Sequence, residues 1–161
     1  VLRTAPGAKA RVVFDNGDQV NVGSATAYRV QWEVKGAPKP ELNLMYGKIR
    51  AVVSKEGPRT GLQIKTRTAT MGVRGTDLYV ADRITRGTEV SVIRGEVAVQ
   101  SEPSAKAVPV KAGATAEVPT VPSAAKAVPV QVRPTTQQDL AVIQRASEIK
   151  KEIAKTDLVD D

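Results

Sequence analysis

Short segments of alternating apolar and polar residues, separated by glycine turns, dominate the first two-thirds of the chain. Most are about five residues long, and β-branched Val and Ile occupy many of the apolar positions, as strands favour. The segments are Ala10–Phe14, Gln19–Val22, Tyr28–Val34, Leu42–Met45, Lys48–Val53, Leu62–Thr70, Thr76–Ala81, Glu89–Ile93 and Glu96–Gln100. Short strands with frequent turns predict an all-β fold, an antiparallel β-sandwich or β-roll of jelly-roll type.

Each segment is expected to bury one face and expose the other, because side chains alternate along a strand. Ile49, Ala51 and Val53 share one face of their segment, and Lys48 and Arg50 lie on the other.

The dipeptide Asn16-Gly17 predicts a type I′ hairpin turn, since both residues tolerate a positive φ. Asp15 and Asp18 flank it, but the spacing of an EF-hand calcium loop is missing, so the turn interpretation is preferred.

The composition changes after residue 101, where Ser104–Val110 recurs as Ser123–Val130 with one Ala inserted. The first copy is predicted to be a strand, and the second is either an edge strand or a linker. A helix is predicted from Thr135 or Thr136, either of which could cap it, with Asp139 in its first turn.

The predicted apolar stripe of this helix is Val142, Ala146, Ile149 and Ile153, which packs against the sheet or against a partner. The predicted domain organisation has three parts. A β domain spans residues 1–118, a linker or edge strand rich in Ala, Val and Pro spans 119–134, and the helix spans 135–157. The chain begins at Val1 rather than Met, which favours a trimmed chain that an export signal or membrane anchor could have preceded.

The chain contains no Cys and no His, which removes the commonest nucleophile–base pairs and zinc ligands. Asp77 and Asp82 are five residues apart, so a strand would point them to opposite faces rather than into one glycosidase cleft. The glycine-containing segment at Met71–Thr76 lacks the lysine of a phosphate-binding P-loop. We therefore expect no enzymatic activity, no cofactor and no metal.

Residues 1–101 hold 16 Lys and Arg against 9 Asp and Glu, whereas residues 102–161 hold 8 of each kind. The basic residues are densest between residues 48 and 74. If the strand of Lys48 and Arg50 pairs with that of Lys65 and Arg67, four cations share one surface. The candidate binding residues for an anionic partner are Lys48, Arg50, Lys65, Arg67 and Arg74.

The alternative interpretation is that acids on neighbouring strands neutralise these cations, and the candidates are Asp77, Glu89 and Glu96. Nucleic acid is disfavoured as a ligand because aromatic residues make up only 3% of the chain. Trp32 shares a face with Val30 and Val34 and is predicted to lie in the core rather than to stack on a sugar.

The segment Gly72–Thr76 is interpreted as a structural corner. Two glycines three residues apart, Gly72 and Gly75, permit a positive φ or a close backbone approach, and Thr76 can hydrogen-bond the backbone there. Arg74 is expected either to bridge carbonyl groups across this turn or to present its guanidinium to a ligand.

Several blocks occur in an order that resembles the FecR family, and together they span about residues 3–118. The most diagnostic is Thr68–Val80, which contains Gly-Val-Arg-Gly-Thr. The other blocks are Phe14–Val20, Leu44–Arg50, Glu89–Val99 and Val108–Ala114. The helix after residue 135 is not part of the family pattern.

The resemblance implies a compact antiparallel β-roll or sandwich in the periplasm or cell envelope of a Gram-negative bacterium. Its best-known members relay a signal between an outer-membrane transporter and a sigma-factor system, and they carry an amino-terminal cytoplasmic segment and a membrane helix. Stand-alone members occur beside envelope or peptidoglycan-associated modules. The leading hypothesis is a non-enzymatic protein-interaction or signal-relay module with an envelope protein partner. The alternative is a binder of an anionic envelope polymer, such as peptidoglycan or acidic polysaccharide.

Overall fold

The computed structural model describes residues 1–31, 40–55, 61–102, 106–120 and 128–148. These residues form thirteen strands and one helix. The strands are β1 (Leu2–Arg3), β2 (Ala10–Val13), β3 (Gln19–Val22), β4 (Ala27–Gln31), β5 (Glu41–Val52), β6 (Leu62–Lys65), β7 (Ala69–Val73), β8 (Asp77–Arg83), β9 (Gly87–Arg94), β10 (Glu96–Ser101), β11 (Ala107–Lys111), β12 (Ala114–Val118) and β13 (Gln131–Pro134). The helix, α1, spans Gln137–Ser147.

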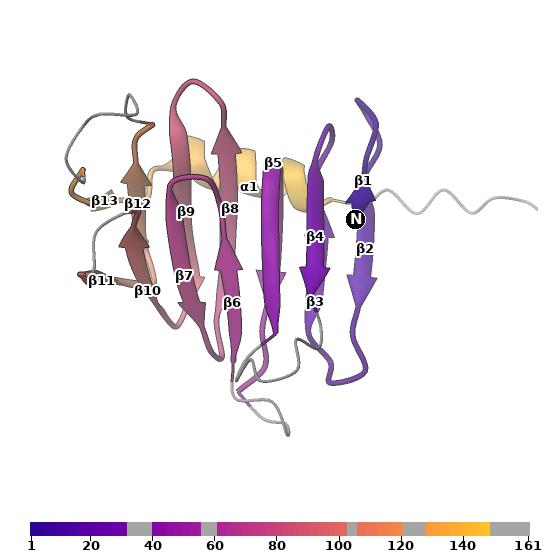
Figure 1. Cartoon of the computed structure of the whole chain (residues 1–161), viewed down its shortest axis with the longest axis horizontal. Helices are drawn as coiled ribbons and strands as arrows, with labels where there is room; N and C mark the ends of the chain where they lie inside the picture. Colours follow the sequence, from indigo (N-terminus) through magenta and orange to yellow (C-terminus); the bar gives the residue numbers. More distant parts are fainter. Residues whose placement is uncertain (32–39, 56–60, 103–105, 121–127, 149–161) are drawn as a thin grey trace, which may run out of the picture.

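The strands form two facing layers that share the long strand β5 (Figure 1). The first sheet contains β1, β4, the amino-terminal half of β5, β6, β7, β10 and β11. The second sheet contains β2, β3, the carboxyl-terminal half of β5, β8, β9, β12 and β13. Neighbouring strands run antiparallel, except that β6 pairs with β5 in parallel. The all-β prediction with a carboxyl-terminal helix is thus confirmed.

Gly47 allows β5 to pass from one sheet to the other. Its φ is +99°, and a Cβ atom there would lie 2.6 Å from Thr26 Cα. Residues with a Cβ atom disfavour this positive φ, and the Cβ atom would also clash with Thr26, so both the backbone conformation and the available space require glycine. The sequence pattern suggested two strands broken at Gly47, but the chain bends there and continues as one strand.

The core lies between the two sheets and is built mainly from aliphatic residues. The predicted inward faces are confirmed in most segments, including Ile49, Ala51 and Val53 on β5. Valines supply much of this core, which suits a pleated surface because β-branched side chains pack well there. Trp32 and Val34 lie outside the described residues.

The segment Leu62–Thr70 was predicted to be one strand, and this is wrong. It forms β6, a turn and the start of β7. The Thr66 hydroxyl accepts hydrogen bonds from the backbone N–H groups of Thr68 and Ala69, at 3.3 and 3.0 Å. A threonine that bonds its own backbone two or three residues on favours a turn over a continuing strand.

The hairpin at Asn16-Gly17 is confirmed, but its turn is not type I′. A type I′ turn requires a positive φ at both Asn16 and Gly17. Gly17 has a φ of +85°, but Asn16 does not have a positive φ, because Ala25 is the one described non-glycine residue that does. Gly17 N–H donates to the Phe14 carbonyl, and Phe14 N–H donates to the Asp18 carbonyl, both at 2.9 Å. This pattern is a three-residue hairpin loop with glycine in the left-handed region.

Helix α1 begins after Thr136, which caps it in a capping box with Asp139, so the second of the two predicted caps is used. Ile143 and Ala146 pack against Tyr79 and Ala81 on the outer face of the second sheet. Figure 1 shows the helix behind that sheet. Of the two predicted roles, packing against the sheet is therefore confirmed.

The predicted apolar stripe of the helix was partly wrong. Val142 is 42% exposed, and Ile143 takes the buried position instead, next to Ala146. Ile149 and Ile153 lie outside the described residues, as does the predicted continuation of the helix to residue 157.

The first copy of the repeat contributes β11, as predicted. After the second copy, β13 pairs with β12 at the edge of the second sheet. The division of the chain into three parts stays a prediction. No helix in the described part of the chain is long and apolar enough to span a membrane.

Candidate functional site

The cations that were predicted to form one patch come from different parts of the fold. Lys48 and Arg50 lie on the second-sheet half of β5, next to β3 and β8. Lys65 lies on β6, which pairs with Glu41–Asn43 at the other end of β5. Arg67 lies in the turn between β6 and β7. The β5–β6 pairing therefore involves the end of β5 away from Lys48 and Arg50 and does not bring the four cations onto one surface.

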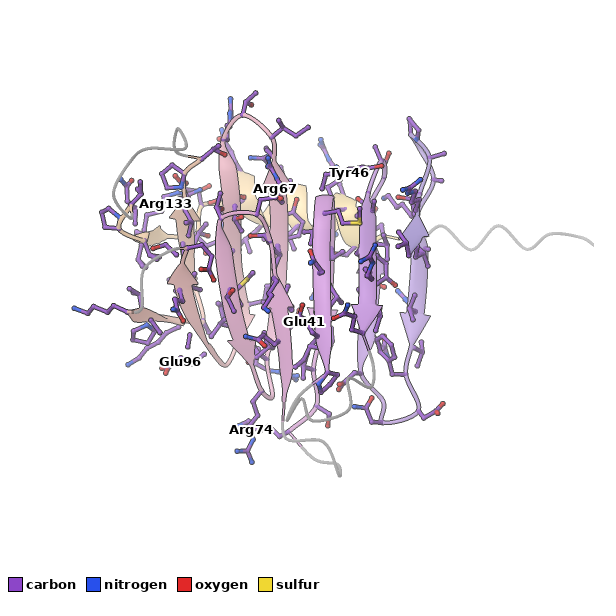
Figure 2. The ribbon with its side chains drawn as sticks, viewed as in Figure 1. Glu41, Tyr46, Arg67, Arg74, Glu96 and Arg133 are labelled. Atoms are coloured by element: carbon purple, nitrogen blue, oxygen red, sulfur yellow. The ribbon has the colours of Figure 1, made fainter. Side chains whose placement is uncertain are left out.

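Three of these cations bind carboxylates of the same chain. Arg50 donates to both carboxylate oxygens of Asp77, at 2.9 and 2.8 Å, and these bonds raise the pKa of Arg50 above its usual value. Lys65 Nζ lies 2.8 Å from a Glu41 oxygen. Figure 2 shows Glu41 and Arg67 at separate places on the ribbon.

Arg67 donates to both oxygens of Asp82, at 2.9 and 2.7 Å, and the pKa of Arg67 is raised by these bonds. Asp77 had been named as a neutralising acid, but sequence reasoning missed Glu41 and Asp82. Asp82 faces Arg67 across the two sheets, a contact that strand alternation cannot predict.

Lys48 has a different role, because its side chain covers a glycine. A Cβ atom on Gly23 would lie 2.4 Å from Lys48 Cγ, and Gly23 N–H donates to the Lys48 carbonyl at 2.8 Å. The Lys48 side chain thus packs along the backbone of the β3–β4 connection, as long aliphatic stems often do.

The predicted corner forms around Gly75 and Thr76. Gly75 has a φ of +61°, and Thr76 is fully buried. The Thr76 hydroxyl lies within hydrogen-bonding distance of the Arg74 and Glu96 carbonyl oxygens, at 3.0 and 3.2 Å, and can donate to one at a time. The predicted backbone bond of Thr76 is thus confirmed. Gly72 lies within β7 rather than in the turn, and a side chain there would meet nothing within 4 Å.

Arg74 is exposed and projects from one end of the molecule, at the bottom of Figure 2. A shallow hollow of about 410 Å³ lies at this corner. Among the described residues it is lined by Ser54, Lys55, Gly75, Arg94 and Gly95. Lys55 lies within the basic region at residues 48–74, but sequence reasoning had not associated Arg94 with it. The two are brought together because β8 pairs with β5 on one side and with β9 on the other.

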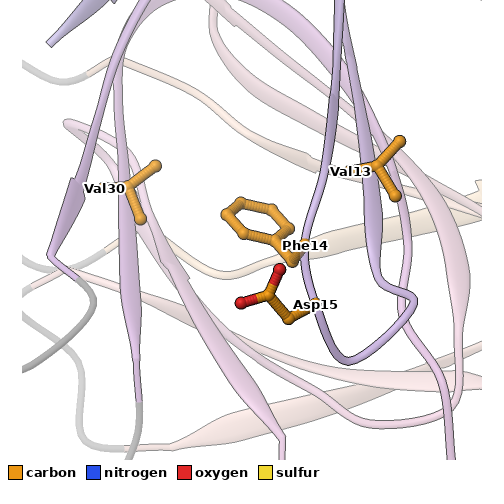
Figure 3. Close-up of a pocket in the computed structure, with 4 residues that line it drawn as sticks. All are labelled: Val13, Phe14, Asp15 and Val30. Carbon is orange, nitrogen blue, oxygen red and sulfur yellow. The ribbon is translucent and has the colours of Figure 1, made fainter.

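A second hollow, of about 310 Å³, lies beside the β2–β3 turn. It is lined by Val13, Phe14, Asp15 and Val30. Figure 3 shows the Phe14 ring between the two valines, with the Asp15 carboxylate beside it. Ser54, which lines the first hollow, donates its backbone N–H to Asp18 Oδ1 in the β2–β3 turn at 2.8 Å. One end of the molecule therefore presents a cationic depression and a second depression lined by Phe14, two valines and Asp15.

Comparisons with known proteins agree with this architecture. Two crystal structures of a "putative anti-sigma factor" from Parabacteroides distasonis ATCC 8503, at 1.65 and 2.50 Å, resemble the chain with TM-scores of 0.71 and 0.70. The identity is 16%, and each alignment covers 89% of this chain but 63% of that one, so the chain spans less than two thirds of the length of these structures. No curated protein matches the chain. The sequence model of the family described as FecR protein matches residues 1–98, which is more than half of the chain. The chain therefore belongs to the FecR family.

Proposed function

We propose that this chain is a non-enzymatic protein-interaction module that relays a signal in the periplasm or cell envelope of a bacterium. The observation that carries the proposal is the FecR match, which runs from β1 into β10 and so includes both sheets. The likeness to a protein described as an anti-sigma factor supports a regulatory role of this kind.

The distribution of charge supports a binding module over a catalytic one. Arg50, Arg67 and Arg133 each form an ion pair with a carboxylate of the same chain, and these ion pairs connect different elements of the fold. Among the described residues, no group of three or more acidic side chains is placed to hold a metal. At the end that carries the two hollows, Lys55, Arg74 and Arg94 are exposed and form no ion pair with another described residue.

This end of the molecule is the proposed docking surface for the protein partner. The β2–β3 turn lies at the bottom of Figure 1, and Arg74 lies at the bottom of the same view in Figure 2. The β8–β9 turn, which contains the 70% exposed Ile84, lies at the top. In helix α1, Ile143 and Ala146 are already covered by the sheet, whereas Leu140 and Val142 are each 42% exposed.

Site-specific photo-crosslinking in the source bacterium tests this proposal. A photoreactive amino acid replaces Arg74 in one variant and Ile84 in the matched control at the opposite end. We expect one discrete crosslinked protein from position 74 and none from position 84, and the purified partner should then bind the purified chain. Absence of a crosslink from both positions, or equal crosslinking from both, would contradict the proposal.

A second candidate function is binding of an anionic envelope polymer, such as peptidoglycan or acidic polysaccharide. The excess of 16 Lys and Arg over 9 Asp and Glu in residues 1–101 favours it. It predicts that the chain co-sediments with protein-free sacculi at low salt and not at high salt, since exposed charges are screened over about 8–10 Å. Lack of sedimentation at low salt would remove this candidate.

A further inference from the structure

The hollow at the Gly75 corner carries positive charge on two sides. Lys55 follows β5 and Arg94 ends β9, and both side chains are exposed. Arg74 stands next to Gly75 in the chain and is also exposed. No ion pair between described residues includes any of these three cations. The hollow therefore differs from the sites of Arg50 on β5, Arg67 in the β6–β7 turn and Arg133 on β13, each of which binds a carboxylate of the chain.

The acidic residue that lies opposite Arg94 on the neighbouring strand already binds another arginine. Asp77 is its register partner on β8, but both Asp77 oxygens accept hydrogen bonds from Arg50, at 2.9 and 2.8 Å. Glu96 follows Arg94 by two residues, but it begins β10, where its register partner is Lys111. Arg94 is thus left at the rim of the hollow with its guanidinium available to a ligand.

Two glycines line the hollow, and the Lys55 side chain covers one of them, Gly75. Gly75 and Gly95 have φ values of +61° and +87°. A Cβ atom on Gly95 would lie 2.9 Å from the Gly75 carbonyl oxygen, and one on Gly75 would lie 2.0 Å from Lys55 Cγ. Within the described residues, the structure records no hydrogen bond donated by the N–H group of either glycine. Backbone N–H groups beside lysine and arginine are a recurring arrangement for binding oxyanions.

We infer that this hollow binds a carboxylate presented by an acidic segment of a protein partner. The inference rests on the proposed function, because a protein partner supplies the ligand. The planar guanidinium matches a carboxylate in two parallel hydrogen bonds, the geometry that Arg50 and Arg67 already adopt within this fold. A depression of about 410 Å³ accommodates an acidic side chain and part of its neighbours.

The probe is an N-acetylated hexaglutamate peptide, with hexaglutamine as the neutral control, titrated into the full chain labelled with ¹⁵N. We expect hexaglutamate to shift the amide signals of Lys55, Gly75 and Gly95 and hexaglutamine to leave them unchanged. The double variant Lys55→Gln/Arg94→Gln should bind at least about tenfold more weakly, because it loses charge-assisted hydrogen bonds.

The matched control is Arg29→Gln/Arg86→Gln, which changes the net charge equally at two exposed arginines outside the hollow. Arg86 lies at the other end of β9, on the order of 25 Å from Arg94. We expect the control to bind as the unmodified chain does. An equal loss of affinity in both double variants, or amide shifts away from the hollow, would overturn the inference.

Inorganic phosphate is titrated in parallel. Binding of phosphate at the same amides, with an affinity equal to that of hexaglutamate, would identify a small-anion site and overturn the acidic-segment inference.

The crosslinking experiment separates this inference from the proposed function. If Lys55→Gln/Arg94→Gln captures the partner from position 74 as well as the unmodified chain does, the inference fails and the function stands. If no partner is captured but hexaglutamate binds the hollow, the function fails and the carboxylate site stands.

Discussion

Asp82 has a completely buried side chain, and both of its carboxylate oxygens accept hydrogen bonds from Arg67, at 2.9 and 2.7 Å. Asp82 belongs to β8 in the second sheet, whereas Arg67 lies in the β6–β7 turn of the first sheet. The pair therefore joins the two layers at one end of the sandwich. A carboxylate buried to this degree is costly without its partner, because its charge would lose both water and compensation.

Replacing Arg67 with alanine should lower the free energy of unfolding by about 2–3 kcal/mol, since it leaves Asp82 unpaired. Urea denaturation measures this change. The control Arg86→Ala removes an exposed arginine and should cost less than about 0.5 kcal/mol. Adding Asp82→Asn to Arg67→Ala should recover part of the loss. Equal effects of the two single alanine variants would show that the pair contributes nothing.

The glycines at positions 47 and 72 should respond oppositely to alanine. Gly47→Ala combines an unfavourable φ of +99° with a Cβ contact of 2.6 Å to Thr26 Cα, so we expect a loss of about 3 kcal/mol or more. Gly72→Ala enters open space within β7 and should be neutral or stabilise by about 0.5 kcal/mol. Thermal and urea unfolding compare the two, and similar stabilities would contradict the role of Gly47 at the bend.

Tyr79 should make the protein less stable at high pH. Burial beneath α1 raises the pKa of Tyr79 to about 12, with a smaller lowering by Arg83 and a smaller raising by Glu89. In the unfolded chain the phenol loses its proton near pH 10. Between these values the folded state holds a proton that the unfolded state has released, so stability falls as the pH rises from about 10 to 12.

The variant Tyr79→Phe isolates this effect from the titration of lysines and other tyrosines. The Tyr79 hydroxyl is buried without a hydrogen-bond partner in the described part of the chain, so removing it should be neutral or stabilising at pH 8. At pH 11 the variant should exceed the unmodified protein by roughly 1–2 kcal/mol. An unchanged difference between the two proteins at pH 8 and pH 11 would contradict the predicted titration.

The docking of α1 should depend on Ile143 and not on Val142. Ile143→Ala removes a buried side chain that packs against Tyr79 and Ala81, and we expect a loss of about 2–3 kcal/mol. Val142→Ala changes a side chain that is 42% exposed and should cost less than about 0.5 kcal/mol. Hydrogen exchange of the helix amides reports the same contrast, with faster exchange expected in Ile143→Ala alone.

The fold class could be predicted because strand periodicity is a local property of the chain. The alternation of Ile49, Ala51 and Val53 with Lys48 and Arg50 places the first three in the core, whichever strands lie beside them. The capped start of the helix could be predicted for the same reason, since Thr136 and Asp139 act on backbone groups within three residues. The corner at Gly75 and Thr76 is likewise local.

The candidate site could be predicted less well, because it depends on which strands become neighbours. Lys65 and Arg67 alternate correctly for a strand, but Thr66 turns the chain between them, and their partners Glu41 and Asp82 come from other elements. The association of Lys55 with Arg94 requires β9 to reach the same corner as the end of β5. Local pattern thus determined most of the strands, their inward faces and the family. Tertiary structure decided which cations are neutralised and which remain exposed, because ion pairing depends on distances between segments that are remote in the chain.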